Sequence, residues 1–210
     1  MVKTKQKIKK IIENILRVSL ILAIIISILE GSWEIVFISL LTFILSYLPS
    51  WLKNKYQLEI PLDFELGIIL FIYASLFLGE IKRFYDLFWW WDIILHALSG
   101  IAFGCLGFII LFLLNKANKI KANPFWICLF ALAFASFIAV IWEIFEFFMD
   151  QIWGTYMQRS LFNTMTDLVV GIGGAAIAIW SGFNFMQGKE KSFLGRLITF
   201  LVEKNSRLNS

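Results

Sequence analysis

The chain has 210 residues, of which 60% are hydrophobic and 16% charged, and its mean hydropathy is +0.79. Such a composition excludes an ordinary water-soluble domain and indicates that the lipid bilayer is the protein's solvent. The formal net charge of +4 comes from basic residues spread over separate segments. This distribution argues against a nucleic-acid partner. No long polar stretch remains for a soluble domain, so a single integral membrane domain over residues 1–210 is expected.

Hydrophobic stretches of about 20 residues, enough to cross a hydrocarbon core of about 30 Å, recur along the chain. They predict an all-α fold, a polytopic bundle of six transmembrane helices. Prolines fall only at the ends of these stretches, where a missing backbone donor costs little. The predicted spans are 15–29, 35–49, 61–79, 93–114, 124–149 and 161–181.

Lysine and arginine are distributed unevenly over the connecting segments. Alternate segments carry sixteen of them, and the others carry three: Lys82, Arg83 and Arg159. The positive-inside rule therefore predicts that both termini are cytoplasmic in a multi-pass protein of the cell (plasma or inner) membrane. Residues 1–14 and 189–210 have apolar residues at helical spacing among basic ones, which predicts amphipathic cytoplasmic ends.

Acidic residues and the single histidine gather toward the outer ends of the later spans. An ionisable group at membrane depth costs about 2.5–3.5 kcal/mol on insertion scales and needs a partner or a function. Asp92 and His96 are four residues apart, so they share one helix face, as do Glu143, Glu146 and Asp150 at spacings of three and four. Asp167 lies in the outer part of the sixth span, and Glu80 ends the third.

Small residues continue from each of these polar groups at four-residue steps, and small residues mark the faces through which transmembrane helices pack closely. The series are His96, Gly100 and Gly104; Glu143, Ala139, Ala135 and Ala131; and Asp167, Gly171 and Ala175. We therefore expect spans four to six to pack through these faces. Such packing would bring His96, Glu143, Glu146 and Asp167 into one pocket that opens outward.

Each of these residues also has a structural interpretation. Asp92 fits a helix N-cap as well as a partner that orients His96, and Asp150 fits an ordinary solvated loop. His96 could be a structural histidine bonded to one carboxylate, and Glu143 and Glu146 could belong to a structural hydrogen-bond network. Arg159, like the other outer basic residues, fits either a solvated loop charge or a contact with an anionic head group.

Short motifs across residues 60–180 are Leu78-Gly79-Glu80, Trp91-Asp92, Leu95-His96, Ser99-Gly100, Trp142-Glu143-Ile144-Phe145-Glu146, Asp150 and Thr164-Met165-Thr166-Asp167-Leu168. Together they resemble the YjdF-like family of small bacterial and archaeal membrane proteins. The resemblance implies a polytopic membrane fold and no established activity. It also implies an aspartate before the Thr-x-x-Asp segment, where this chain has Asn163. A more distant similarity to VanZ-like membrane proteins rests on general layout.

Carboxylates and one imidazole suit Mg, Mn, Fe or Zn, so a divalent metal is the cofactor that this set would take. The candidate ligands are Asp92, His96, Glu143, Glu146, Asp150 and Asp167. The candidate catalytic residues are His96, Glu143, Glu146 and Asp167, with Glu80 and Arg159 as further site residues. A metal-dependent or acid–base enzyme acting on a lipid or lipid-linked substrate is the leading hypothesis. A proton- or ion-coupled transporter and a structural or partner-binding membrane protein are the alternatives.

Overall fold

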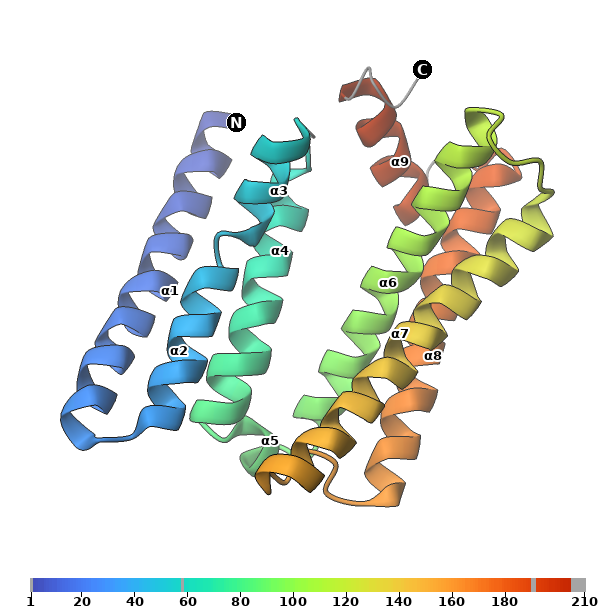
Figure 1. Cartoon of the computed structure of the whole chain (residues 1–210). Helices are drawn as coiled ribbons and strands as arrows, with labels where there is room; N and C mark the ends of the chain where they lie inside the picture. The colour runs from blue at the N-terminus through green and yellow to red at the C-terminus, as the bar shows by residue number, and fades with distance from the viewer. Residues whose placement is uncertain (1, 58, 190–191, 205–210) are drawn as a thin grey trace. The chain divides into compact units, whose positions relative to one another are not determined.

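The computed structural model describes residues 2–57, 59–189 and 192–204, which form helices and connecting turns without any strand (Figure 1). The helices are α1 (Val2–Glu30), α2 (Trp33–Leu45), α3 (Leu48–Tyr56), α4 (Leu62–Ile72), the π-helix η1 (Tyr73–Ile81), α5 (Phe84–Leu87), α6 (Trp91–Lys116), α7 (Pro124–Trp153), α8 (Leu161–Met186) and α9 (Phe193–Lys204).

Six helical stretches among the described residues are long and apolar enough to cross a membrane. They are Thr4–Glu30, Trp33–Tyr56, Leu62–Ile81, Trp91–Lys116, Pro124–Ile152 and Leu161–Met186. Each contains most or all of one predicted span, so the all-α polytopic fold with six transmembrane helices is confirmed.

Local sequence signals explain where the later helices begin and end. Asn123 caps α7, because its side chain accepts a hydrogen bond from the Trp126 amide at 3.1 Å, and Pro124 occupies the first turn. Ser160 caps α8 in the same way through the Asn163 amide, also at 3.1 Å. Gly154 ends α7 in the left-handed conformation, with φ of 66°.

The N-terminal half departs from the predicted boundaries. The predicted amphipathic segment and the first span form one helix, α1, because residues 2–30 contain neither proline nor glycine. The second span continues as α3 to Tyr56, beyond its predicted end at residue 49. At the other end of the chain, α9 occupies most of the predicted amphipathic segment, and residues 190–191 and 205–210 of that segment lie outside the described residues.

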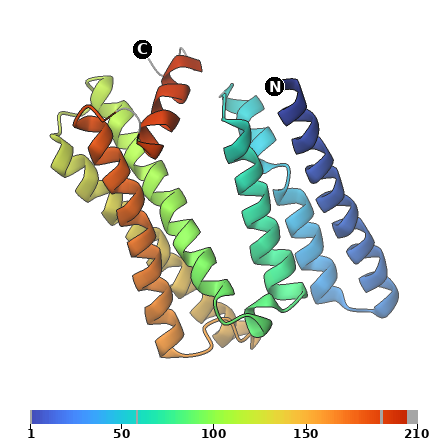
Figure 2. The ribbon, with the colours of Figure 1, turned by 180° about the vertical axis from the view of Figure 1, so that it is seen from behind.

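Contacts divide the chain into two compact units, Met1–Trp91 and Asp92–Ser210. The prediction of a single domain stays a prediction. In the first unit, α1 packs against α2 and α4, and η1 packs against α2 (Figures 1 and 2). Leu20 of α1 and Ile69 of α4 are fully buried there. Apolar packing between these helices therefore holds the first unit together.

In the second unit, α6, α7 and α8 lie side by side, as both views show (Figures 1 and 2). Small residues let α6 and α8 approach at backbone distance. A methyl group added to Gly100 would collide with the carbonyl oxygen of Gly171, and one added to Gly104 would lie 2.9 Å from the α carbon of Ala175. These two contacts join the two predicted small-residue faces, so α6 and α8 pack as their sequences suggested.

This packing makes a prediction about stability. Gly100→Ala is expected to lower the free energy of unfolding by about 1–3 kcal/mol, because the new methyl group must displace backbone atoms of α8. The matched control is Gly173→Ala, since the methyl group that it adds has no described atom within 4 Å outside its own stretch of α8. Thermal unfolding midpoints of the two variants in detergent would check the expectation. Equal midpoints would contradict the close contact of α6 with α8.

Candidate functional site

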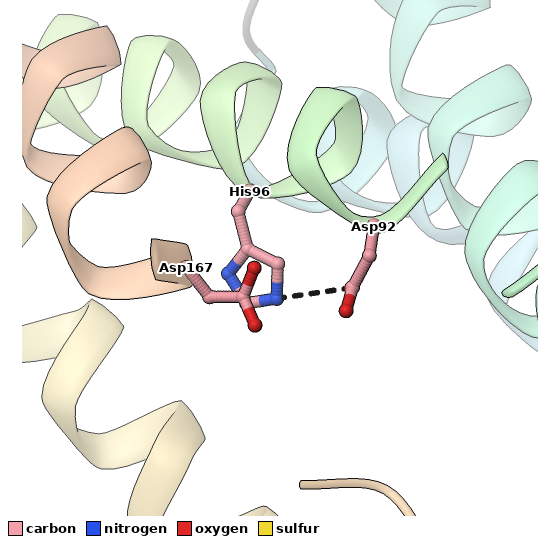
Figure 3. Close-up of side chains that lie close together, drawn as sticks. All are labelled: Asp92, His96 and Asp167. Carbon is pink, nitrogen blue, oxygen red and sulfur yellow. Dashed lines mark ion pairs between the residues drawn. The ribbon is translucent and has the colours of Figure 1, made fainter. Parts of the chain in front are cut away.

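The candidate site begins at the start of α6. Asp92 lies in the first turn of this helix, and His96 follows one turn later on the same face. The His96 Nε2 atom is 3.4 Å from Asp92 Oδ1, an ion pair when the imidazole is protonated (Figure 3). The Asp92 carboxylate thus faces the His96 ring, and its role in orienting that ring stays a prediction.

Helix α8 brings a second aspartate to this pair. The Asn163 side-chain amide donates one hydrogen bond to Asp167 Oδ2 at 2.7 Å and another to Asp92 Oδ2 at 3.1 Å. Asn163 precedes Asp167 by one helical turn, so both side chains point to the same side of α8. The single amide therefore links the two aspartates across the interface between α6 and α8.

Asp92, His96 and Asp167 each offer one ligand atom, and these three atoms lie within 4.8 Å of one another. Figure 3 shows the Asp167 carboxylate beside the His96 ring. Atoms that bind one ion at about 2.1 Å lie at most about 4.2 Å apart, so small side-chain adjustments would bring the three onto a common ion. The Asp167 side chain is 2% exposed, and its Oδ1 has no hydrogen-bond partner among the described residues.

Helix α7 contributes Glu143, whose Oε1 lies 4.0 Å from His96 Nδ1. The residue is 5% exposed, and neither carboxylate oxygen has a donor at hydrogen-bond geometry among the described residues, although the Thr164 hydroxyl lies close enough to interact with the carboxylate. A buried carboxylate normally has such partners, because desolvation without them costs free energy. Glu143 therefore has capacity for a proton, a water molecule or a ligand.

The other two acidic residues of α7 are engaged locally. Glu146 is buried, and its Oε1 accepts a hydrogen bond from the Trp142 indole at 2.8 Å. Asp150 accepts bonds through both carboxylate oxygens, from the Thr155 hydroxyl at 2.6 Å and the amides of Met157 and Gln158 at 2.8 and 3.1 Å. Asp150 thus fixes the loop between α7 and α8. The structure does not place either residue with the three candidate ligand atoms.

Two further predicted site residues lie outside these helices. Arg159 lies half-buried in the loop before α8 and interacts electrostatically with Asp92 and Asp167. Its positive charge offsets part of the negative charge of the site. Glu80 is exposed near the end of η1 and belongs to the other compact unit. Its proposed role stays a prediction.

The sequence profile of a family described as "Predicted membrane protein (DUF2238)" matches residues 12–188. The chain belongs to the DUF2238 family. The matched region starts within α1 and ends just after α8, so it includes Asp92, His96, Glu143 and Asp167. The protein is therefore a member of a family of membrane proteins, in agreement with its six apolar helices.

An "uncharacterized protein" of Thermotoga maritima is 30% identical to this DUF2238 chain over 122 residues. The alignment covers 55% of the chain and 59% of the relative, so the chain spans less than two thirds of that protein. No solved structure matches. The similarity names no activity for either protein.

Sequence reasoning did not include Asn163 or Trp142 among the site residues. Each lies four residues before an acid that it contacts, Asp167 and Glu146 respectively. A search for amide and indole donors one turn from each membrane acid would have found both residues. Asn163 is recognisable from the sequence as a polar neighbour of Asp167 and as a departure from the resembled family, but its bridging role depends on the contact between α6 and α8.

Proposed function

We propose that the protein is a divalent-metal-dependent enzyme that acts on a lipid or lipid-linked substrate. The observation that supports it is the convergence of Asp92, His96 and Asp167 within 4.8 Å, beside the buried and unsatisfied Glu143. Two carboxylates and an imidazole form a donor set suited to Mg, Mn, Fe or Zn. The unpartnered Asp167 Oδ1 is the atom that a cation would satisfy.

Within this proposal a bound cation would make a water molecule more acidic and polarise a carbonyl or phosphoryl oxygen. Glu143 is the proposed general base. It accepts a proton from water, and the water oxygen forms a bond to the carbon or phosphorus of an ester. The bond from that atom to the departing oxygen then breaks, and the departing oxygen receives the proton. In this proposal His96 Nε2, which faces Asp92, would be the ligand atom, and the other ring nitrogen, Nδ1, faces Glu143 at 4.0 Å.

The position of the residues along their helices supports a lipid-like substrate. His96 lies five residues after the start of α6 and Asp167 six after the start of α8, which is about 7–9 Å along each helix axis. Large apolar side chains of α7 next to Glu143, such as Ile144 and Phe145, are exposed on the protein surface and so available to lipid. Arg159 is the proposed contact for an anionic group of the substrate.

The transporter alternative requires polar groups that continue across the bundle. One or more turns along the helices from the site, however, Gly100 and Gly104 of α6 touch α8 at backbone distance. Ala131 and Ala135 of α7 are buried. Close apolar packing leaves little room for an ion path there. The structural alternative has its own support, since the Asn163 amide already links two helices through Asp92 and Asp167.

The orientation and the location of the protein are parts of the proposal as well. The charge bias supports cytoplasmic termini in the plasma or inner membrane, so that the candidate site opens outward. The closer relationship to YjdF-like proteins also remains a proposal. It rests on the short motifs around His96, Glu143 and Asp167.

Elemental analysis of the detergent-purified protein tests the metal site. We expect about one Mn, Fe, Zn or Mg ion per wild-type chain. The double variant Asp92→Asn/Asp167→Asn should lose it, because each amide keeps the shape of the side chain and removes the charge. Asp63→Asn is the matched control, since this carboxylate is 77% exposed and lies in the other unit. Equal metal content in all three proteins, or none in the wild type after incubation with Mn²⁺ or Zn²⁺, would refute the proposal.

The substrate class can be tested in the same preparation. The protein is reconstituted into vesicles of total bacterial lipid extract, and lipid species are compared by mass spectrometry before and after incubation. We expect the wild type to convert one or more lipid species and Asp92→Asn/Asp167→Asn to convert none. If the lipid composition changes equally with both proteins, the enzyme proposal is contradicted.

A further inference from the structure

A second polar cluster lies in the unit Met1–Trp91, on α1, α3 and α4. The Lys9 ammonium is 2.7 Å from Glu65 Oε1 and 3.1 Å from Glu13 Oε1, and the Ser50 hydroxyl donates to Glu65 at 3.2 Å. Glu13 and Glu65 are 7% and 3% exposed. Lys9 therefore pairs with both acids, which the surrounding helices remove from solvent.

Arg17 completes this cluster. Its guanidinium is 3.8 Å from Glu13 Oε2, donates to the Ser46 hydroxyl and carbonyl at 3.2 and 3.1 Å, and covers the Tyr47 ring at 3.9 Å. Two cations, Lys9 and Arg17, thus balance two anions, Glu13 and Glu65. The charges inside the cluster cancel, so any further basic residue beside it leaves a net positive charge.

Further basic residues line a cavity of about 560 Å³ that borders the cluster. Lys9 and Glu65 form part of its wall, and Lys7, Lys10 and Lys53 surround them. Lys53 pairs with Glu59 at 3.1 Å, whereas Lys7 and Lys10 are exposed and form no ion pair with a described residue. The cavity therefore presents at least two uncompensated positive charges. Their natural complement is an anionic group.

The cavity continues into an apolar groove. Asn14 lines both the cavity and a shallow, open apolar groove of about 400 Å³, which is formed by α1 alone and follows Ile15, Val18 and Leu22. From Asn14 to Leu22 the helix rises about 12 Å. These groove side chains belong to a predicted membrane-spanning stretch, where acyl chains are the available apolar occupant. A basic cavity joined to an apolar groove matches the two parts of a phospholipid.

We propose that this cavity and groove bind one anionic phospholipid, with its phosphate on Lys7 and Lys10 and an acyl chain along Val18 and Leu22. Basic pockets between transmembrane helices bind anionic head groups, and each lysine near the surface adds to the attraction. A free phosphate would use the lysines alone. The groove is the feature that favours the lipid, and the site is independent of the metal proposal.

Native mass spectrometry of the full-length protein in detergent tests the site with phosphatidylglycerol and with phosphatidylcholine. The wild type should bind phosphatidylglycerol preferentially. Lys7→Gln/Lys10→Gln should bind it about 10- to 30-fold more weakly. The matched control, Lys119→Gln/Lys121→Gln, removes two exposed lysines elsewhere and should bind as the wild type does. An equal loss in the control, or no preference in the wild type, would overturn the proposal.

Two further measurements separate lipid from free anion. Val18→Trp should fill the groove and weaken phosphatidylglycerol binding without a change of charge, since Val18 is exposed and its replacement leaves the ion pairs intact. Inorganic phosphate should fail to displace the lipid at millimolar concentration. Displacement by phosphate, together with unchanged lipid binding in Val18→Trp, would show an anion site and refute the lipid assignment. Metal content should be unchanged in all these variants, so this test does not depend on the proposed enzyme.

Discussion

Replacing Glu143 with glutamine (Glu143→Gln) is expected to slow the lipid turnover of the reconstituted protein by about 10²- to 10⁴-fold, the usual contribution of a general base. The amide keeps the size of the side chain but cannot accept the proton. Because Asp92, His96 and Asp167 are unchanged, the metal content should equal that of the wild type. Turnover measured by mass spectrometry and metal measured by elemental analysis check both parts.

Glu146→Gln is the comparison for this variant. The amide oxygen of the new side chain can still accept the Trp142 hydrogen bond, so turnover should fall by less than tenfold. Loss of the metal in Glu143→Gln would make Glu143 a ligand and contradict its role as a base. A larger loss of turnover in Glu146→Gln would transfer that role to Glu146.

The second large effect concerns the stability of the unit Met1–Trp91. Lys9→Met is expected to lower the free energy of unfolding by about 3–5 kcal/mol, because Glu13 and Glu65 would keep their burial and lose the ammonium between them. The Lys9 side chain is only 12% exposed, so water from the neighbouring cavity would replace the ammonium only in part. Denaturant titration of the detergent-solubilised protein, followed by tryptophan fluorescence, measures the change.

A second substitution tests the physical cause. Lys9→Met/Glu65→Gln restores the charge balance with Arg17 and Glu13, so part of the lost stability should return. Lys10→Met is the control on the same helix, since Lys10 is exposed and forms no ion pair with a described residue. If Lys9→Met and Lys10→Met lower the free energy of unfolding by the same amount, the ion pairs of Lys9 do not stabilise the protein.

Hydrophobic length and local capping signals made the six spans predictable. A stretch of about 20 apolar residues has no stable place other than the membrane, and Asn123-Pro124 and Ser160 mark helix starts through their own side chains. The continuity of α1 was less visible, since the lysines near its start suggested a separate surface helix. The π-helix η1 was not predicted, because apolar periodicity does not distinguish it from an α-helix.

Within the second unit, spacing and small residues predicted the approach of some side chains but not the local engagement of Glu146 by Trp142. His96 lies near Asp92, Glu143 and Asp167, and the glycines below it contact α8. Their roles in binding or catalysis stay predictions. The engagement of Asp150 by its loop depends on the backbone between residues 154 and 158, whose course apolar periodicity does not reveal.

The ion pairs of Lys9 could not be predicted from the sequence. Glu65 follows Pro61 in the first turn of α4, a position that by itself indicates a helix-start residue. Its partner Lys9 is 56 residues earlier, in an N-terminal segment whose lysines by themselves indicate only a basic end. Periodicity within one helix places residues on a face but does not choose the helix that the face meets.

The amide at position 163 has a consequence for electroneutrality. With Asn163 uncharged, the three proposed ligands carry two carboxylates, whose combined charge is equal and opposite to that of one divalent ion. The aspartate implied there by the resembled family would add a third negative charge and turn two attractive hydrogen bonds into repulsions. Asn163→Asp would thus convert a balanced ion site into an anionic one that needs an additional counter-ion.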